Sequence, residues 1–157
     1  MKKLFFVVAV FTFTFINAQE QAVKANPIGL AFGIANAGYE FSINDTQTVT
    51  ISALYYNVSD VSGFGAGGEY RFYFSDEALR GWHAGPTAGF FSLEGSGLFS
   101  DTTATIFTIG GEVGHQWILG EHFLVDTFLG IGFVSGGGDL SVDGTAIGLG
   151  VSLGYAW

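Results

Sequence analysis

The C-terminal part of the chain alternates strictly between bulky and small side chains over residues 145–157. Ile147 and Leu149 belong to the bulky set, and Gly148 and Gly150 belong to the small set. A period of two residues is that of a β-strand, whose successive side chains point to opposite faces. These thirteen residues exceed the roughly 9–11 that a tilted strand needs to cross a bilayer. The segment therefore predicts a membrane-spanning strand with one apolar face.

The same alternation recurs, less purely, in five upstream segments: residues 49–55, 64–74, 82–91, 107–117 and 123–133. The ionisable residues of these segments fall mainly opposite the bulky row, as Glu69 and Arg71 do opposite Tyr70 and Phe72. Apolar groups outside and polar groups inside are typical of an outer-membrane barrel. The sequence therefore predicts an all-β fold, an eight-stranded antiparallel up-and-down transmembrane β-barrel. A soluble barrel with the bulky face turned inward is the alternative.

The N-terminal part of the predicted barrel changes the parity of its apolar row. Bulky residues occupy even positions over residues 28–34 and odd positions over residues 37–43, so the parity flips near Ala35 and Asn36. Either a β-bulge inserts one residue there, which gives seven strands, or the chain turns back between two short strands, which gives eight. An even strand count with both termini on one side favours the turn.

The connections between the predicted strands alternate in length. Those expected to be short are residues 44–47, 75–81 and 119–122, and those expected to be longer are 57–63, 94–103 and 135–144. Short periplasmic turns and longer extracellular loops are expected of this class of protein. Trp82, Trp117, Tyr155 and Trp157 then lie at the periplasmic ends of strands. We expect these four residues to form an aromatic girdle at the membrane interface.

The first 18 residues predict a secretory signal peptide, because Lys2 and Lys3 precede a short apolar run and Ala18 is a small residue at the expected cleavage point. Residues 19–157 then form one outer-membrane barrel domain. It keeps three of the five basic residues and all fourteen acidic residues, so its formal charge is 3 − 14 = −11. Such an acidic domain excludes nucleic acid as a favoured partner. The sequence has no cysteine, which excludes disulfides and thiolate metal sites.

A set of charged residues is predicted to face the barrel interior, with His83 and Gln116 nearby in the pattern. This interior polar cluster comprises Glu40, Glu69, Arg71, Glu112 and Asp126. An unpaired charge in a narrow interior is costly, so an ion-paired plug is the expected arrangement. A gated polar pathway or a small-cation site is the alternative, because carboxylates outnumber Arg71.

The residues that could carry catalysis do not form a recognisable set. His83, His115 and His122 map to the periplasmic ends, whereas Ser92 and Ser135 map to the extracellular half. A serine hydrolase needs its histidine beside the nucleophile. Two histidines alone are weak grounds for a zinc site. We therefore expect no enzyme activity, no catalytic residues, no metal and no cofactor.

The signal sequence, the amphipathic strands and the aromatic C-terminal strand together resemble small outer-membrane β-barrels of the OmpA/OmpX-like type. Residues 26–30, 39–41 and 148–157 are similar to a porin-like family of Bacteroidetes-type bacteria. The resemblance implies contact with outer-membrane lipids and lipopolysaccharide, and insertion by the barrel-assembly machinery, which reads a C-terminal aromatic residue. Phe is commonest there, so Trp157 is a mild departure.

We expect a monomer with a structural, envelope-integrity or surface-interaction role. The alternative function is a narrow conduit or binder for small solutes or ions, using the interior lined by glutamate and arginine.

Overall fold

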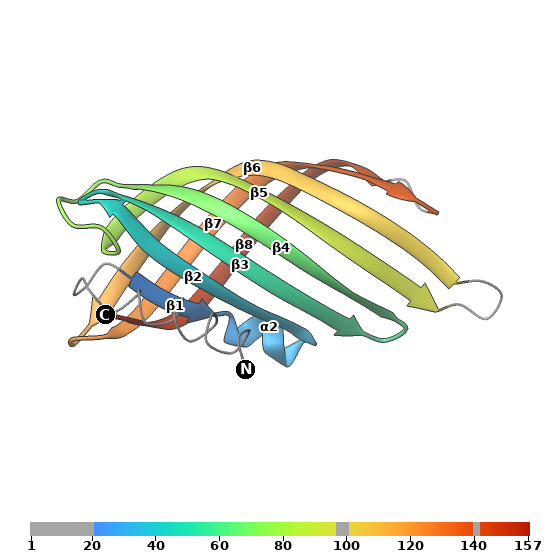
Figure 1. Cartoon of the computed structure of the whole chain (residues 1–157), viewed down its shortest axis with the longest axis horizontal. Helices are drawn as coiled ribbons and strands as arrows, with labels where there is room; N and C mark the ends of the chain where they lie inside the picture. The colour runs from blue at the N-terminus through green and yellow to red at the C-terminus, as the bar shows by residue number, and fades with distance from the viewer. Residues whose placement is uncertain (1–20, 97–100, 140–141) are drawn as a thin grey trace, which may run out of the picture.

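The structure is a computed structural model that describes residues 21–96, 101–139 and 142–157, so the predicted signal peptide lies outside the described residues. The elements, in chain order, are β1 (Gln21–Ala25), α2 (Pro27–Ala31), β2 (Ile34–Asn44), β3 (Gln47–Val58), β4 (Val61–Tyr73), β5 (Gly81–Ser96), β6 (Asp101–Leu119), β7 (Phe123–Gly138) and β8 (Val142–Ala156). Each strand pairs antiparallel with its neighbour along the chain, and β1 pairs with β8 to close the barrel (Figure 1). The prediction of an all-β, eight-stranded up-and-down barrel is confirmed.

Within the part of the chain that the structure describes, no helix combines the length and the apolar character that crossing a membrane requires.

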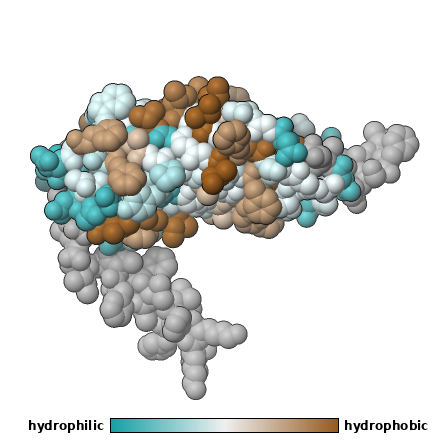
Figure 2. Space-filling view, turned by 90° about the horizontal axis from the view of Figure 1, so that it is seen from above, coloured by the Kyte–Doolittle hydropathy of each residue, from teal (hydrophilic) through white to brown (hydrophobic). Residues whose placement is uncertain are grey.

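The strand alternation places a belt of large apolar side chains on the outer wall of the barrel. Its most exposed members include Ile51, Phe64, Phe107, Ile109, Leu129, Ile131, Phe133, Ile147 and Leu149. Hydrophobic residues gather along the wall in Figure 2, and hydrophilic residues lie toward the two ends. The interior carries the opposite parity, so it receives the polar and small residues of each strand.

The barrel has a proximal end and a distal end, which differ in their connections. The proximal end carries Gln21 and Trp157, whose backbones exchange hydrogen bonds of 3.1 and 2.9 Å, and the connections at residues 45–46, 74–80 and 120–122. The distal end carries the turn at residues 59–60 and the far ends of the β5–β6 and β7–β8 hairpins. The two chain termini described therefore meet at one end, as an even strand count requires.

The N-terminal strands differ from the sequence prediction in position, although their number is right. Residues 28–32 do not form a strand; Pro27–Ala31 is the short helix α2, and β2 starts at Ile34, before the parity flip. The Asn26 side chain accepts a hydrogen bond of 2.9 Å from the Gly29 amide. Asn at the N-cap and Pro at the first helical position are a helix-start signal, and this local signal outweighed the apolar alternation that followed it.

The expected contrast in loop length is also wrong. At the distal end β3 and β4 are joined by only two residues, and β5 to β8 extend through most of the predicted loops. Among the described connections that contain no helix, the longest, residues 74–80, lies at the proximal end instead. The predicted distal loops keep their strand pairing because their polar side chains find partners: the Ser135 hydroxyl donates to Asp143 at 2.7 Å, and Asp139 accepts from the Thr103 amide at 2.8 Å.

Candidate functional site

The proximal half of the barrel interior holds a network of buried charges that comes from six different strands. The inward parity of β2, β4, β6 and β7 brings together all five residues of the predicted interior polar cluster. They converge because an eight-stranded barrel is just wide enough for its side chains to meet across the axis. β1 adds Lys24 and β5 adds His83. We call the whole set the interior charge network.

Arg71 is the centre of this network and is only 2% exposed. Its Nη2 atom lies 2.6 Å from a Glu69 oxygen and 2.9 Å from a Glu112 oxygen. Its Nη1 atom lies 2.7 Å from Asp126 Oδ2 and 3.7 Å from Glu40 Oε2. One guanidinium therefore faces four carboxylates, and its planar set of N–H donors suits this role.

Lys24 is the second cation of the network, and the alternation pattern of the sequence predicts no place for it in the barrel. Its Nζ atom lies 2.7 Å from Glu40 Oε2 and 3.2 Å from Asp126 Oδ2. The strand that carries Lys24 has only five residues. So short a segment shows no extended apolar row, and the parity of Lys24 could have been read only from its neighbours Ala22 and Val23.

Neutral polar groups complete the network around two of the carboxylates. Glu40 accepts hydrogen bonds from the Thr48 hydroxyl at 2.5 Å and from the Tyr73 hydroxyl at 2.8 Å. His83 Nε2 lies 3.0 Å from Asp126 Oδ1. His83 is fully buried inside the barrel. Its parity in β5 is opposite to that of Trp82, so His83 faces the interior, whereas His115 and His122 contact aromatic rings of the girdle.

The network contains four carboxylates and two permanent cations, so its balance is acidic. Buried charges persist only when they are paired, and here each carboxylate has at least one cation within 4.0 Å. Among residues 21–96, 101–139 and 142–157, no group of three or more His, Cys, Asp or Glu residues is arranged to hold a metal ion. These ion pairs connect strands on opposite sides of the barrel across its axis.

The connection between β4 and β5 closes the proximal end beneath the network. Leu79 is fully buried there and packs with Ala22, Leu124 and Ala156. Its carbonyl oxygen accepts a hydrogen bond of 2.8 Å from Gln116 Nε2, which fixes the connection to the inner wall. The same Gln116 presents its side-chain oxygen to Lys24 Nζ at 3.3 Å. The apolar contact and the charge network thus form one continuous plug.

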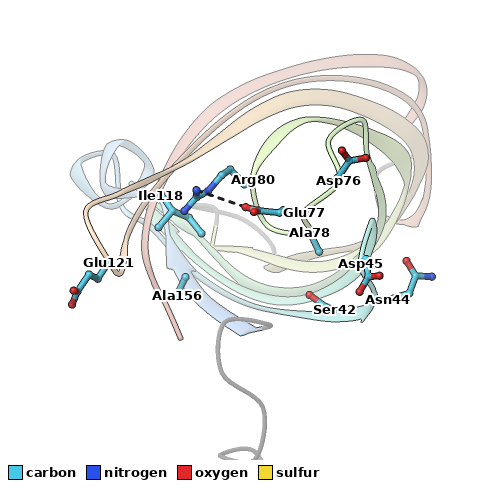
Figure 3. Close-up of a pocket in the computed structure, with 10 residues that line it drawn as sticks. All are labelled: Ser42, Asn44, Asp45, Asp76, Glu77, Ala78, Arg80, Ile118, Glu121 and Ala156. Atoms are coloured by element: carbon cyan, nitrogen blue, oxygen red, sulfur yellow. Dashed lines mark ion pairs between the residues drawn. The ribbon is translucent and has the colours of Figure 1, made fainter.

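A shallow cavity of about 280 Å³ lies outside this plug at the proximal mouth (Figure 3). Its acidic lining residues are Asp45, Asp76, Glu77 and Glu121. Arg80 pairs with Glu77 over 3.7 Å, and both side chains are mostly exposed. A solvent-exposed pair of this kind contributes little to stability or binding.

The four residues of the predicted aromatic girdle lie at the proximal end. The Trp82 and Trp117 rings both contact the His115 ring, and the Tyr155 and Trp157 ring centroids are 6.1 Å apart. His122 stacks on Tyr155 with ring centroids 4.7 Å apart and hydrogen bonds to the Ala156 carbonyl oxygen. His115 and His122 thus belong to separate aromatic groups.

Comparison with solved structures gives a fold match to the N-terminal β-barrel domain of Pseudomonas aeruginosa OprF, with a TM-score of 0.56 at 13% sequence identity. The match covers 89% of this chain and 98% of that domain. No curated protein sequence matches this chain. The family described as "Protein of unknown function (DUF3575)" matches residues 4–140. This chain, an eight-stranded barrel with a network of charged side chains inside, therefore belongs to the DUF3575 family.

Proposed function

We propose that this protein is an integral outer-membrane β-barrel that serves the envelope structurally or by surface interaction, without catalysis or a cofactor. The observation that carries the proposal is a closed barrel whose outer wall is apolar and whose proximal interior holds a network of ion pairs. Lipid is the solvent that an exposed apolar wall of this kind fits. The resemblance to OmpA/OmpX-like barrels and the expected signal peptide support the same location.

The outer wall supports membrane insertion because many of its large apolar side chains are exposed, which is unfavourable in water. Ile147 and Leu149 are 73% and 82% exposed, and Phe133 is 70% exposed. A soluble barrel buries such a row in its core, whereas the buried side chains here are mainly charged or polar. The proposed surroundings of the wall are therefore outer-membrane lipids and lipopolysaccharide. We also propose that the barrel-assembly machinery inserts the protein and that the protein is a monomer.

Heat is expected to change the gel mobility of the protein, because a barrel closed by hydrogen-bonded strands resists SDS until it is boiled. The measurement compares unheated and boiled samples of the outer-membrane fraction on one SDS gel. We expect the unheated band to run at a different apparent mass from the boiled band. A single band in both lanes, with the protein in the soluble periplasmic fraction, would contradict membrane insertion.

The alternative function, a narrow conduit for small ions, is favoured by the four carboxylates that face only two cations. The plug argues against it, because Arg71 crosses the axis and Leu79 fills the proximal end. We expect purified protein in planar bilayers to give no stable conductance steps. Cation-selective steps whose size changes in Glu112→Gln would instead establish the conduit.

A further inference from the structure

The barrel wall has a gap in its distal half, between β2 and β8. β1 is the strand that joins them, but its last pairs are Lys24 with Gly38 and Ala25 with Leu153. Beyond these pairs, the described structure gives β2 no β1 partner at residues 34–37, and β8 none at residues 142–152. Both faces of β8 are exposed from residue 143 to residue 149. The wall is therefore complete only in its proximal half on this side.

Helix α2 lies across this gap, since it contacts both β2 and β8. Its sequence is entirely apolar, and the side chains of Ile28 and Leu30 are more than half exposed on its surface. The backbone amide of Asn26 donates to the Asn36 side chain at 2.7 Å before the helix, and the Gly33 carbonyl accepts from the Asn57 amide at 2.9 Å after it. The helix is thus an apolar flap that is anchored to β2 and β3 at its two ends.

A cavity of about 130 Å³ lies inside the barrel against this gap. Asn36, Ala37 and Gly38 from one margin and Ser152 from the other line it. Its large apolar lining residues are Leu54, Phe91 and Phe128, from β3, β5 and β7, and we call them the apolar wall of the cavity.

Two glycines make room for the aromatic rings of this wall. A Cβ atom on Gly65 would overlap the Phe91 ring, and one on Gly150 would overlap the Phe128 ring. The positions of these two rings therefore depend on the glycines that pair with them on the neighbouring strands.

We propose that this cavity binds the end of a hydrocarbon chain of a membrane lipid, which passes between β2 and β8 at helix α2. The inference rests on the proposed function, because it requires the barrel wall to face lipid. Ile147 and Leu149 of the apolar belt lie in the part of β8 that has no β1 partner, so the gap borders this belt. Its size is close to that of an apolar cavity of about 150 Å³ that accommodates benzene, so it suits the end of a chain and not a headgroup.

The charged part of the cavity lining disfavours an anionic headgroup as the occupant. Lys24, Glu69 and Arg71 line the cavity, but the two cations are already engaged with carboxylates of the interior charge network. An anionic headgroup would meet a network with excess negative charge, which repels it. A neutral hydrocarbon end meets Leu54, Phe91 and Phe128 instead, and the removal of its apolar surface from water there is favourable.

Photolabelling tests this site directly. The full protein is reconstituted in phosphatidylethanolamine/phosphatidylglycerol vesicles that contain a phospholipid with a diazirine at the end of one acyl chain. After irradiation, labelled residues are located by mass spectrometry of peptides. We expect label on outward residues such as Leu129 and Phe133, and also on inward Phe91 and Leu54. Label on outward residues alone would overturn the cavity proposal and leave membrane insertion intact, whereas no label anywhere would overturn both.

A variant that fills the cavity tests whether the hydrocarbon chain reaches the inward residues through the gap between β2 and β8. In Ser152→Phe, the added ring occupies the cavity beside β2, so label on Phe91 and Leu54 should fall several-fold while label on Leu129 is unchanged. Thr108→Phe is the matched control, because it places the same ring inward on β6, where Thr108 lines a different cavity. Both variants must first show the heat-dependent gel shift of the folded barrel. Equal inward labelling in Ser152→Phe and the unaltered protein would overturn the proposal.

Discussion

Replacing Arg71 with leucine is expected to lower the free energy of unfolding by about 3–5 kcal/mol, the usual cost of removing one partner from a buried ion pair. The change leaves Glu40, Glu69, Glu112 and Asp126 with Lys24 as the remaining permanent cation within the network. Lys24 reaches only Glu40 and Asp126, so Glu69 and Glu112 lose their cation. Urea titration of the refolded protein in detergent micelles measures the effect.

Arg80→Leu is the control for this experiment. Arg80 also pairs with a glutamate, but its side chain is 53% exposed and the pair spans 3.7 Å. Removal of an exposed pair is expected to change the stability by less than about 1 kcal/mol. Equal losses in the two variants would show that Arg71 does not hold the interior together. If Arg71→Leu does not refold at all while Arg80→Leu does, the expected order of the two effects is still met.

Gly85→Ala is expected to destabilise the barrel by about 1–3 kcal/mol, the range typical of an overpacked site. A Cβ atom on Gly85 would overlap the backbone carbonyl oxygen of Tyr70 on β4. The ladder between β4 and β5 is interrupted beside this contact, where Pro86 has no N–H to donate. Because backbone atoms cannot move aside as a flexible side chain can, the strands must separate. The midpoint of urea unfolding measures the effect.

Gly148→Ala makes the same chemical change at another inward strand position and serves as the control. A Cβ atom on Gly148 meets nothing within 4 Å. Its substitution should therefore leave the midpoint of unfolding nearly unchanged or raise it slightly, since alanine restricts the unfolded chain more than glycine does. Equal destabilisation by both changes would show that replacing any strand glycine weakens the barrel, and that the contact with Tyr70 is not the cause.

The strand alternation was sufficient to predict which face of the barrel each long strand presents. Glu69, Arg71, Glu112 and Asp126 were placed inside by parity alone, because neighbouring side chains in a strand must point to opposite faces. The number of strands followed from the same pattern together with the need for both termini to lie at one end. These are properties of local backbone geometry, so a single sequence carries them.

The N-terminal region shows where this reasoning fails. Asn26 and Pro27 start a helix, yet Ile28 and Leu30 keep the spacing of a strand, and two local signals compete within seven residues. The parity of the apolar row could not show that the true first strand is Gln21–Ala25. Only its pairing with both β2 and β8 makes so short a segment a strand of the barrel.

The sequence by itself therefore determined the barrel, its apolar outer wall and the inward position of most members of the interior charge network, because each depends on a period of two residues. The tertiary structure decided which charges meet. Lys24 reaches Asp126, 102 positions away in the chain, only because β1 closes the barrel against β8. It also decided that α2 and a gap replace the distal half of β1. Contacts between segments so distant in the chain depend on closure and register, which no local pattern encodes.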